Sequence, residues 1–270
     1  MKISVISVTY NSAKIIDQTF GDLLNRDDIE IFVVDNKSSD NTCEILENLG
    51  ANNLTVIKNH ENIGYGRASN IAILKSSGEF ILLINPDANI GYGDLLALAD
   101  LAKTQNIGII APDVLQKSAQ NIEVFDVDYV IFGIALLQRN CIDSIGIFDE
   151  NIFMYCEDLD MCRRAKFAGF RVCECVGIPA FHIGGGSSPG VKGVTYFKEY
   201  QYAIAKMYYK LKHFPEKYSF HSLHLKYIMR YALGFIFAVL FCKISNIIKY
   251  LARLKGILHS HFNAKATLSR

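Results

Sequence analysis

Short apolar runs alternate with stretches of helical periodicity along the first part of the chain. The apolar runs are four to eight residues long, rich in β-branched residues and bounded by polar turns, which is typical of strands. They lie at 2–8, 29–34, 54–58 and 79–84. Amphipathic stretches with helical spacing lie between them, at 13–24, 42–49 and 68–76. This alternation predicts an α/β domain with a largely parallel sheet.

The same alternation continues further along the chain. A helix is predicted at 95–104, a strand at 107–111, an apolar run at 129–137, a helix at 153–169 and a strand at 171–176. The helix at 153–169 has an acidic start and a basic middle, which suits the helix dipole, and Gly169 is placed to end it.

Polar residues gather where the predicted strands end, and ligands of open α/β sheets bind beyond the carboxyl ends of strands. Asp35 could accept hydrogen bonds from a nucleobase or a ribose, with Thr9 and Asn11 beside it. An Asx turn that caps the next helix through Asp40 explains Asp35 equally well. Asp87 could hold a hard cation that bridges a diphosphate, or it could simply form a turn.

An acidic cluster opens the helix at 153–169. Glu157, Asp158 and Asp160 cannot all face one side at about 100° per residue. Asp160 can pair with Arg164 one turn later, which leaves Glu157 and Asp158 at the helix mouth. One of these carboxylates could act as a general base, or both could merely complement the helix dipole.

Two classes of nucleotide-binding enzyme fit this sequence poorly. A dinucleotide-dependent redox enzyme needs a glycine-rich turn directly after the first strand, where this chain has no glycine. Gly64 and Gly66 form only the first part of such a fingerprint, and they follow the third strand. A sugar nucleotidyltransferase would need a glycine-rich, basic triphosphate-binding loop after the first strand, and this loop is absent from the sequence.

Taken in order, the motifs resemble those of a large known family. They are Val5-Ile6-Ser7-Val8-Thr9-Tyr10-Asn11-Ser12, Val33-Val34-Asp35-Asn36-x-Ser38-Ser39-Asp40, Asn62-x-Gly64-Tyr65-Gly66 with Asn70, Leu83-x-Asn85-Pro86-Asp87, Gly146-x-Phe148-Asp149-Glu150, Phe153-x-Tyr155-x-Glu157-Asp158-x-Asp160, Arg164, Ala168-Gly169-Phe170-Arg171-Val172 and His182-x-Gly184-Gly185-Gly186-Ser187. Across residues 2 to 190 the chain resembles the inverting nucleotide-sugar glycosyltransferases of family 2, and among them the rhamnosyltransferase-like members.

The resemblance implies a GT-A fold, a Rossmann-like and mostly parallel sheet flanked by helices. It implies the metal-dependent, inverting transfer of a sugar from a dTDP- or UDP-sugar to a hydroxyl of a cell-surface polysaccharide, such as O-antigen, or of a lipid-linked glycan precursor. Rhamnose is the first candidate for the sugar, and galactofuranosyl or hexosaminyl transfer is an alternative. A non-catalytic, membrane-bound scaffold that keeps the nucleotide-binding fold is the alternative from another class.

The resemblance also assigns roles to residues. Nucleotide-sugar binding falls to Thr9, Tyr10, Asn11, Asp35, Asn36, Asn62, Gly66, Asn70 and Asn85. Asp87 and His182 would bind Mg²⁺ or Mn²⁺. Asp158 is similar to the catalytic base of the family, with Glu157 as the alternative. Asn85 is a departure, because it stands where many relatives have the first aspartate of the metal motif.

Composition separates the end of the chain from the rest. Half of the 270 residues are hydrophobic and 20% are charged, which excludes a disordered chain. From Lys206 onward there are 12 lysines and arginines and a single acid, Glu216, whereas acidic residues outnumber basic ones before it. We therefore expect a glycosyltransferase domain at 1–205 and a basic, amphipathic helical extension at 206–270.

The basic extension suggests an anionic partner. Its longest apolar run, 231–242, has 12 residues, whereas a transmembrane helix needs about 20. Lys243, Lys249, Arg253 and Lys255 are interleaved with apolar residues up to Ile257, which predicts a helix in the interface of an anionic membrane.

Packing of these helices on the catalytic domain, or on a second copy in a homo-oligomer, is the alternative to membrane binding. No nucleic-acid-binding module accompanies the basic residues, so nucleic acid is not expected as a partner. The seven cysteines have no metal-type spacing, and the chain opens on a strand. We expect a cytoplasmic protein, peripheral on the inner face of the bacterial cell membrane.

Overall fold

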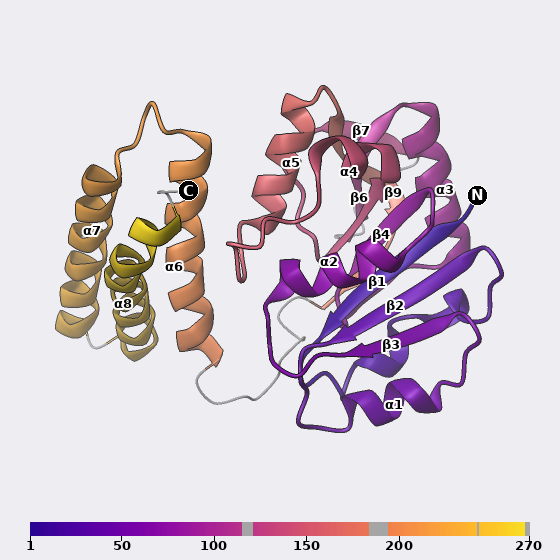
Figure 1. The fold of residues 1–270 in the computed structure, drawn as a ribbon, viewed down its shortest axis with the longest axis horizontal. Helices are drawn as coiled ribbons and strands as arrows, with labels where there is room; N and C mark the ends of the chain where they lie inside the picture. Colours follow the sequence, from indigo (N-terminus) through magenta and orange to yellow (C-terminus); the bar gives the residue numbers. More distant parts are fainter. Residues whose placement is uncertain (115–120, 184–193, 242, 268–270) are drawn as a thin grey trace. The chain divides into compact units, whose positions relative to one another are not determined.

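The computed structural model describes residues 1–114, 121–183, 194–241 and 243–267 (Figure 1). Its packing divides the chain into two compact units. The first comprises Met1–Glu150 and Glu157–Pro189, and the second comprises Asn151–Cys156 and Gly190–Arg270. The first helix of the second unit begins at Val194 and continues through residue 205, where the sequence predicted a domain boundary.

The first unit is built on one eight-stranded sheet of order β3-β2-β1-β4-β8-β6-β9-β7. Its strands are β1 (Ile3–Thr9), β2 (Ile29–Asp35), β3 (Leu54–Lys58), β4 (Phe80–Ile84), β6 (Ile107–Asp113), β7 (Glu123–Asp126), β8 (Ile134–Gln138) and β9 (Arg171–Pro179). The first four strands are parallel, β8 runs antiparallel to β4 and β6, and β7 runs antiparallel to β9. A small second sheet pairs β5 (Ala88–Asn89) with β10 (Phe181–His182).

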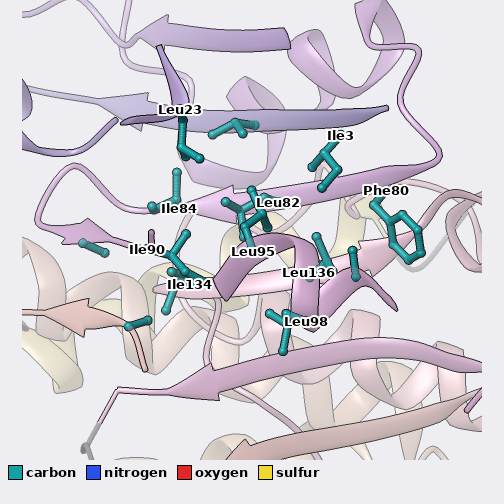
Figure 2. Packing of buried hydrophobic residues seen from close by; sticks show 14 of the residues in the cluster. Ile3, Leu23, Phe80, Leu82, Ile84, Ile90, Leu95, Leu98, Ile134 and Leu136 are labelled. Atoms are coloured by element: carbon teal, nitrogen blue, oxygen red, sulfur yellow. The ribbon is translucent and has the colours of Figure 1, made fainter. Parts of the chain in front are cut away.

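Helices cover both faces of this sheet. Their bounds are η1 (Ile16–Gln18), η2 (Gly21–Leu23), α1 (Thr42–Asn48), α2 (Tyr65–Lys75), α3 (Tyr92–Thr104), α4 (Arg139–Ile145) and α5 (Glu157–Phe167). Residues of η1, η2, α1 and α3 bury one face, and residues of α2, α4 and α5 bury the other. Figure 2 shows the first of these cores, where Leu95 and Leu98 of α3 lie among strand residues such as Leu82 and Leu136.

The stretch 13–24 was predicted to be a helix, and this prediction is wrong. It forms the two separate 3-10 turns η1 and η2, because the backbone changes direction at Gly21, whose φ is 41°. Ile16, Phe20 and Leu23 are nevertheless buried. The helical spacing of these three residues therefore predicted their burial correctly, although the backbone is not an α-helix.

The helix predicted at 153–169 begins later than expected. Its α-helical part, α5, starts at Glu157 because Tyr155 and Cys156 both have left-handed backbone conformations, with φ of 69° and 64°. Gly169 lies beyond the helix end with a φ of 85°, which agrees with its predicted role. The consequence is that the two carboxylates occupy the first positions of α5.

The second unit contains α6 (Val194–His213), α7 (Phe220–Leu240) and α8 (Ile244–Thr267), which share a small core (Figure 1). The apolar run at 231–242 falls mostly within the longer α7. By length and composition alone, α7 is the helix of the described residues that could cross a bilayer, with a mean hydropathy of 1.4 over its most apolar 18 residues.

The α8 residues that were predicted to face a membrane are divided between the inside and the outside of the second unit. Ile257 is fully buried, and Arg253 forms an ion pair with Glu199. Ile248 and Leu251 are exposed. Part of the predicted interface of α8 is therefore internal packing.

The predicted pair of Asp160 and Arg164 is confirmed, since Arg164 Nε lies 2.8 Å from Asp160 Oδ2. The Asp160 side chain is only 1% exposed. The same guanidinium donates to the carbonyl oxygens of Ile145, Gly146 and Ile147. Arg164 therefore fastens α5 to the segment that leads out of α4.

Arg164→Met should destabilise the first unit by about 3 kcal/mol, because it leaves the Asp160 carboxylate buried without its cationic partner. Lys166→Met is the control on the same helix. It breaks an ion pair with Asp128, whose side chain is 94% exposed, and should therefore cost much less stability than Arg164→Met. Urea unfolding measures both values, and equal losses would contradict this account of α5.

Candidate active site

The ends of β1 and β2 meet at the carboxyl edge of the sheet. The two strands pair in register up to Thr9 and Asp35, and Thr9 Oγ1 donates to Asp35 Oδ1 over 2.8 Å. Both residues are buried. Ser38 adds two donors to the same carboxylate, its backbone N–H at 2.8 Å from Oδ2 and its hydroxyl at 2.5 Å from Oδ1. The turn that the sequence offered as an explanation of Asp35 is therefore present.

The loop after β1 is fastened to the loop after β2. Asn11, with a φ of 54°, donates its backbone N–H to Ser38 Oγ, and its side-chain Oδ1 accepts from the Ser39 N–H at 2.7 Å. Its neighbour Tyr10 is 38% exposed. The loop thus presents an aromatic side chain to solvent one residue after Thr9, which orients the Asp35 carboxylate.

Two of the predicted binding residues, Asn36 and Asn62, shape the turn before α2. The Asn36 amide donates to the Gly64 carbonyl oxygen and accepts from the Asn59 side chain, at 3.1 and 2.9 Å. Asn62 Oδ1 accepts from the Gly64 N–H. Gly64 has a φ of 89°, a conformation that glycine adopts without steric cost. These amides set the position at which α2 begins.

Asn70 and Gly66, which were predicted to bind the nucleotide sugar, both take part in packing. The Asn70 side chain donates to the Phe148 carbonyl oxygen and accepts from the Phe148 N–H, and the residue is only 2% exposed. A Cβ on Gly66 would lie 3.1 Å from the Phe148 Cβ. Both residues thus let the segment at Phe148 pack closely on α2, which leaves no accessible amide group at Asn70.

Asp87 and His182 are 95 positions apart in the sequence but lie in contact. Asp87 follows β4, and pairing of β10 with β5 places His182 opposite Ala88. His182 Nε2 lies 3.4 Å from Asp87 Oδ1, and the Asn85 amide nitrogen is also 3.4 Å from His182 Nε2. The Asp87 side chain is 1% exposed. The three residues predicted for the diphosphate and its metal are therefore together.

Gly133 positions the imidazole, and the sequence interpretation missed it. A Cβ at Gly133 would lie 2.4 Å from His182 Cε1, so any larger residue would displace the ring. The Gly133 carbonyl oxygen also accepts from the Asn85 N–H at 2.8 Å. The available signal was a glycine inside the apolar run at 129–137, where the strand β8 begins only after it, at Ile134.

The donor atoms of Asp87 and His182 suit a divalent cation such as Mg²⁺ or Mn²⁺. A carboxylate supplies hard oxygen, and imidazole is a common nitrogen ligand. Within the described residues no group of three or more histidine, cysteine, aspartate or glutamate side chains could hold a metal ion. Asp87 and His182 could thus supply two ligands to such an ion. The glycine loop 184–188 lies outside the described residues.

The two carboxyl groups at the start of α5 differ in their electrostatics. Burial and the adjacent charge of Asp158 raise the pKa of Glu157 to about 8, and burial also raises the pKa of Asp158. Asp158 Oδ1 accepts the Leu159 N–H at 2.8 Å, which stabilises its charged form. Of the two adjacent carboxyls, Glu157, with a pKa of about 8, therefore keeps its proton near neutral pH, and the hydrogen bond from Leu159 favours the charged form of Asp158.

The first turns of α5 and α2 lie near one another. The pKa of Tyr65, the first residue of α2, is raised by burial and by the charges of Glu157 and Asp158. Tyr65 donates its hydroxyl to the Phe132 carbonyl oxygen, next to Gly133. Tyr65 thus connects the start of α2 to the segment next to Gly133.

A cavity of about 270 Å³ adjoins His182. Its lining includes Asp113, Gly133 and Glu174, contributed by or adjoining β6, β8 and β9. Most of its other lining residues, among them Ile131, Ile134 and Val176, are apolar.

The sequence model of the family described as Glycosyl transferase family 2 matches residues 4–164, more than half of the chain. The chain belongs to glycosyltransferase family 2. Its matched region contains every candidate site residue except His182. The mostly parallel sheet flanked by helices is the GT-A fold, as the resemblance predicted.

Several known glycosyltransferases are similar in sequence to this chain. A low-salt glycan biosynthesis hexosyltransferase, Agl10 of Haloferax volcanii, is 23% identical over 67% of this chain and 66% of its own length. A poly(ribitol-phosphate) beta-N-acetylglucosaminyltransferase, TarS of Staphylococcus aureus, is 38% identical over 32% of this chain and 16% of its own. The rhamnosyltransferase WbbL of Escherichia coli is 24% identical over 44% of this chain and 59% of its own length.

Among solved structures, the mannosyltransferase PcManGT from Pyrobaculum calidifontis, in complex with GDP-Man and Mn²⁺, has a TM-score of 0.62 at 17% identity. The alignment covers 98% of this chain and 75% of that one. A structure of residues 1–349 of TarS with UDP-GlcNAc has a TM-score of 0.57 at 17% identity. The alignment covers 97% of this chain and 92% of that one. At these identities the likeness establishes the fold.

Glu157→Gln should change how stability depends on pH. Because the pKa of Glu157 is raised above its ordinary value, the folded protein holds a proton that the unfolded chain releases, so folding weakens as pH rises from about 5 to about 8. The glutamine variant lacks this ionisation. Its free energy of unfolding should therefore fall by on the order of 2 kcal/mol less over that pH range than the free energy of the wild type does. Urea unfolding across pH measures the difference, and parallel curves for the two proteins would contradict a buried, protonated Glu157.

Proposed function

We propose that this family 2 enzyme is an inverting glycosyltransferase. It moves a sugar from a nucleoside-diphosphate donor to a hydroxyl of a cell-surface polysaccharide or a lipid-linked glycan precursor. The observation that carries the proposal is the contact of Asp87 with His182 at the carboxyl edge of the sheet, where Thr9 and Asp35 also end their strands. A donor diphosphate and its cation fit at this edge.

The nucleoside binds between the loops after β1 and β2. Thr9 and Ser38 donate hydrogen bonds to Asp35 and fix the orientation of its carboxylate, which can then meet a donor on the base or the ribose. The exposed ring of Tyr10 can stack on the base. Asn11 orders both loops, so the nucleoside meets a surface whose geometry is already set.

The diphosphate and the metal bind at Asp87 and His182, with Asn85 beside them. The divalent cation, when bound, neutralises the negative charge that develops on the departing nucleoside diphosphate. Burial of Asp87 strengthens its attraction for a cation, because little water screens the carboxylate. Gly133 keeps the imidazole aimed at this carboxylate.

Asp158 is the proposed general base. It removes the proton from the acceptor hydroxyl while that oxygen attacks the anomeric carbon in line, and the bond to the diphosphate oxygen breaks with its electron pair. A single displacement inverts the configuration at that carbon. Glu157 keeps its proton near neutral pH, so it adds no second negative charge beside the acceptor.

The names of the relatives support a sugar transferred onto a glycan. Rhamnose from a dTDP-sugar is the first candidate, because the rhamnosyltransferase WbbL is similar to this chain. Hexosaminyl transfer from a UDP-sugar is the alternative, because TarS is similar as well. Galactofuranosyl transfer, the cytoplasmic location and a homo-oligomer remain predictions from the sequence.

Asp158→Asn should retain donor binding and lose transfer by roughly a thousandfold or more, since asparagine preserves the shape but cannot accept the proton. Calorimetric titration of the nucleotide sugar and product formation on an acceptor glycan measure the two properties separately. Full transfer activity in this variant would remove Asp158 from the role of base.

Asp87→Ala should weaken the metal-dependent part of donor binding by roughly a hundredfold, because the ion loses its carboxylate ligand. The control is Asp100→Ala, which removes an exposed carboxylate from α3. Titrations of the donor with Mn²⁺ and with chelator isolate the metal-dependent part. An unchanged dependence on Mn²⁺ in the Asp87 variant would exclude this metal site.

A further inference from the structure

One face of α7 is apolar and exposed to solvent. Leu225, Met229, Leu233, Ile236 and Leu240 follow one another at intervals of three or four residues, and each is more than half exposed. This interval places them on one side of the helix. We call these five residues the α7 stripe.

More apolar side chains adjoin the α7 stripe. They are Phe237, Val239, Phe241 and Ile244, all exposed. Phe237 and Phe241 stack on one another with ring centroids 6.4 Å apart. Soluble proteins rarely leave a continuous apolar surface of this extent uncovered, so it marks an interaction site.

The opposite face of α7 is already used inside the second unit. Leu223, Tyr227 and Tyr231 are buried in the core that α7 shares with α6 and α8. Lys210 of α6 lies over the Tyr227 ring, and Arg253 of α8 lies over the Tyr231 ring. These contacts hold α7 in the bundle, so its stripe is available to a partner that approaches from outside.

Charge indicates the kind of partner. Lys226 and Arg230 are exposed on α7 within the length of the stripe, and Lys243 is exposed just beyond its end. Neither α7 nor α8 contains an aspartate or a glutamate. An apolar surface bordered only by positive charge complements an anionic lipid bilayer, where the apolar side chains enter the acyl region and the cations meet the headgroups.

We propose that the α7 stripe is the surface by which this protein docks on an anionic membrane, with α7 lying in the interface and remaining packed in its bundle. A second copy of the chain fits the stripe less well. A two-fold interface centred on the stripe would bring the same cations, including Lys226 and Arg230, close to their own copies without an acidic residue of α7 or α8 to compensate.

A tryptophan probe tests the docking face directly, because the chain contains no tryptophan. Phe237→Trp in the full-length protein places the fluorophore beside the stripe. Its emission should shift to shorter wavelength, and brominated lipid should quench it, when vesicles of phosphatidylcholine and phosphatidylglycerol are added. The shift should be much weaker with phosphatidylcholine alone.

Leu74→Trp is the matched control, since Leu74 is 73% exposed but lies on α2 in the first unit. Its emission should not respond to vesicles. A response at Leu74 equal to that at Phe237, or no response at either site, would overturn the proposal. A shift of Phe237→Trp that grows with protein concentration without lipid would show that the stripe binds a second copy instead.

Vesicle co-sedimentation tests the energetics of the same surface. Leu233→Asp should weaken binding to the anionic vesicles roughly tenfold or more, and Leu74→Asp should leave it unchanged. Circular dichroism of each variant confirms that the helices remain folded. Equal binding by the wild type and the folded Leu233 variant would contradict the proposal. Neither assay contains donor or acceptor, so its outcome is independent of the proposed sugar transfer.

Discussion

The candidate site depends on the way in which a buried parallel sheet ends. β1 is hydrogen-bonded on both sides, by β2 and β4, so its backbone groups are satisfied until the strands stop. Beyond that edge the chain must turn, and polar side chains gather in the turns. Thr9 and Asp35 join the loops after β1 and β2, and Asp87 contacts His182 at the same edge. These are the residues to which we assign donor and metal binding in the proposed function.

The remaining groups reach this edge from distant parts of the chain. β10 adds His182 to Asp87 through a two-stranded sheet, and Gly133 leaves room for the imidazole. α5 begins at its carboxyl pair because two left-handed residues delay the helix. Burial of Glu157 costs stability at neutral pH, as is common where a site needs two neighbouring carboxyls with different protonation states.

The sequence predicted the sheet edge well, because Asp35 directly follows one apolar run and Asp87 lies three residues after another, and both runs form strands. It could not distinguish ligand contacts from packing at Asn70, since an amide serves either purpose and the distant backbone of Phe148 decides which. The spacing of Ile16, Phe20 and Leu23 described their burial but not their backbone, because 3-10 turns satisfied the same pattern. β5 and β10 are too short to give a periodic signal, so the sequence context left His182 as either a metal ligand or a loop histidine, and the family resemblance favoured the ligand.

The most direct test of the central claim is the linkage between metal and nucleotide binding. Calorimetric titration of UDP, dTDP and GDP into the wild-type protein, with and without Mn²⁺, measures it. The account predicts that one nucleoside diphosphate binds much more tightly with Mn²⁺, and that the same nucleotide tightens Mn²⁺ binding by an equal factor. If no nucleoside diphosphate bound in the presence of Mn²⁺, or if the two bound independently, the site assigned to Asp87 and His182 would be contradicted.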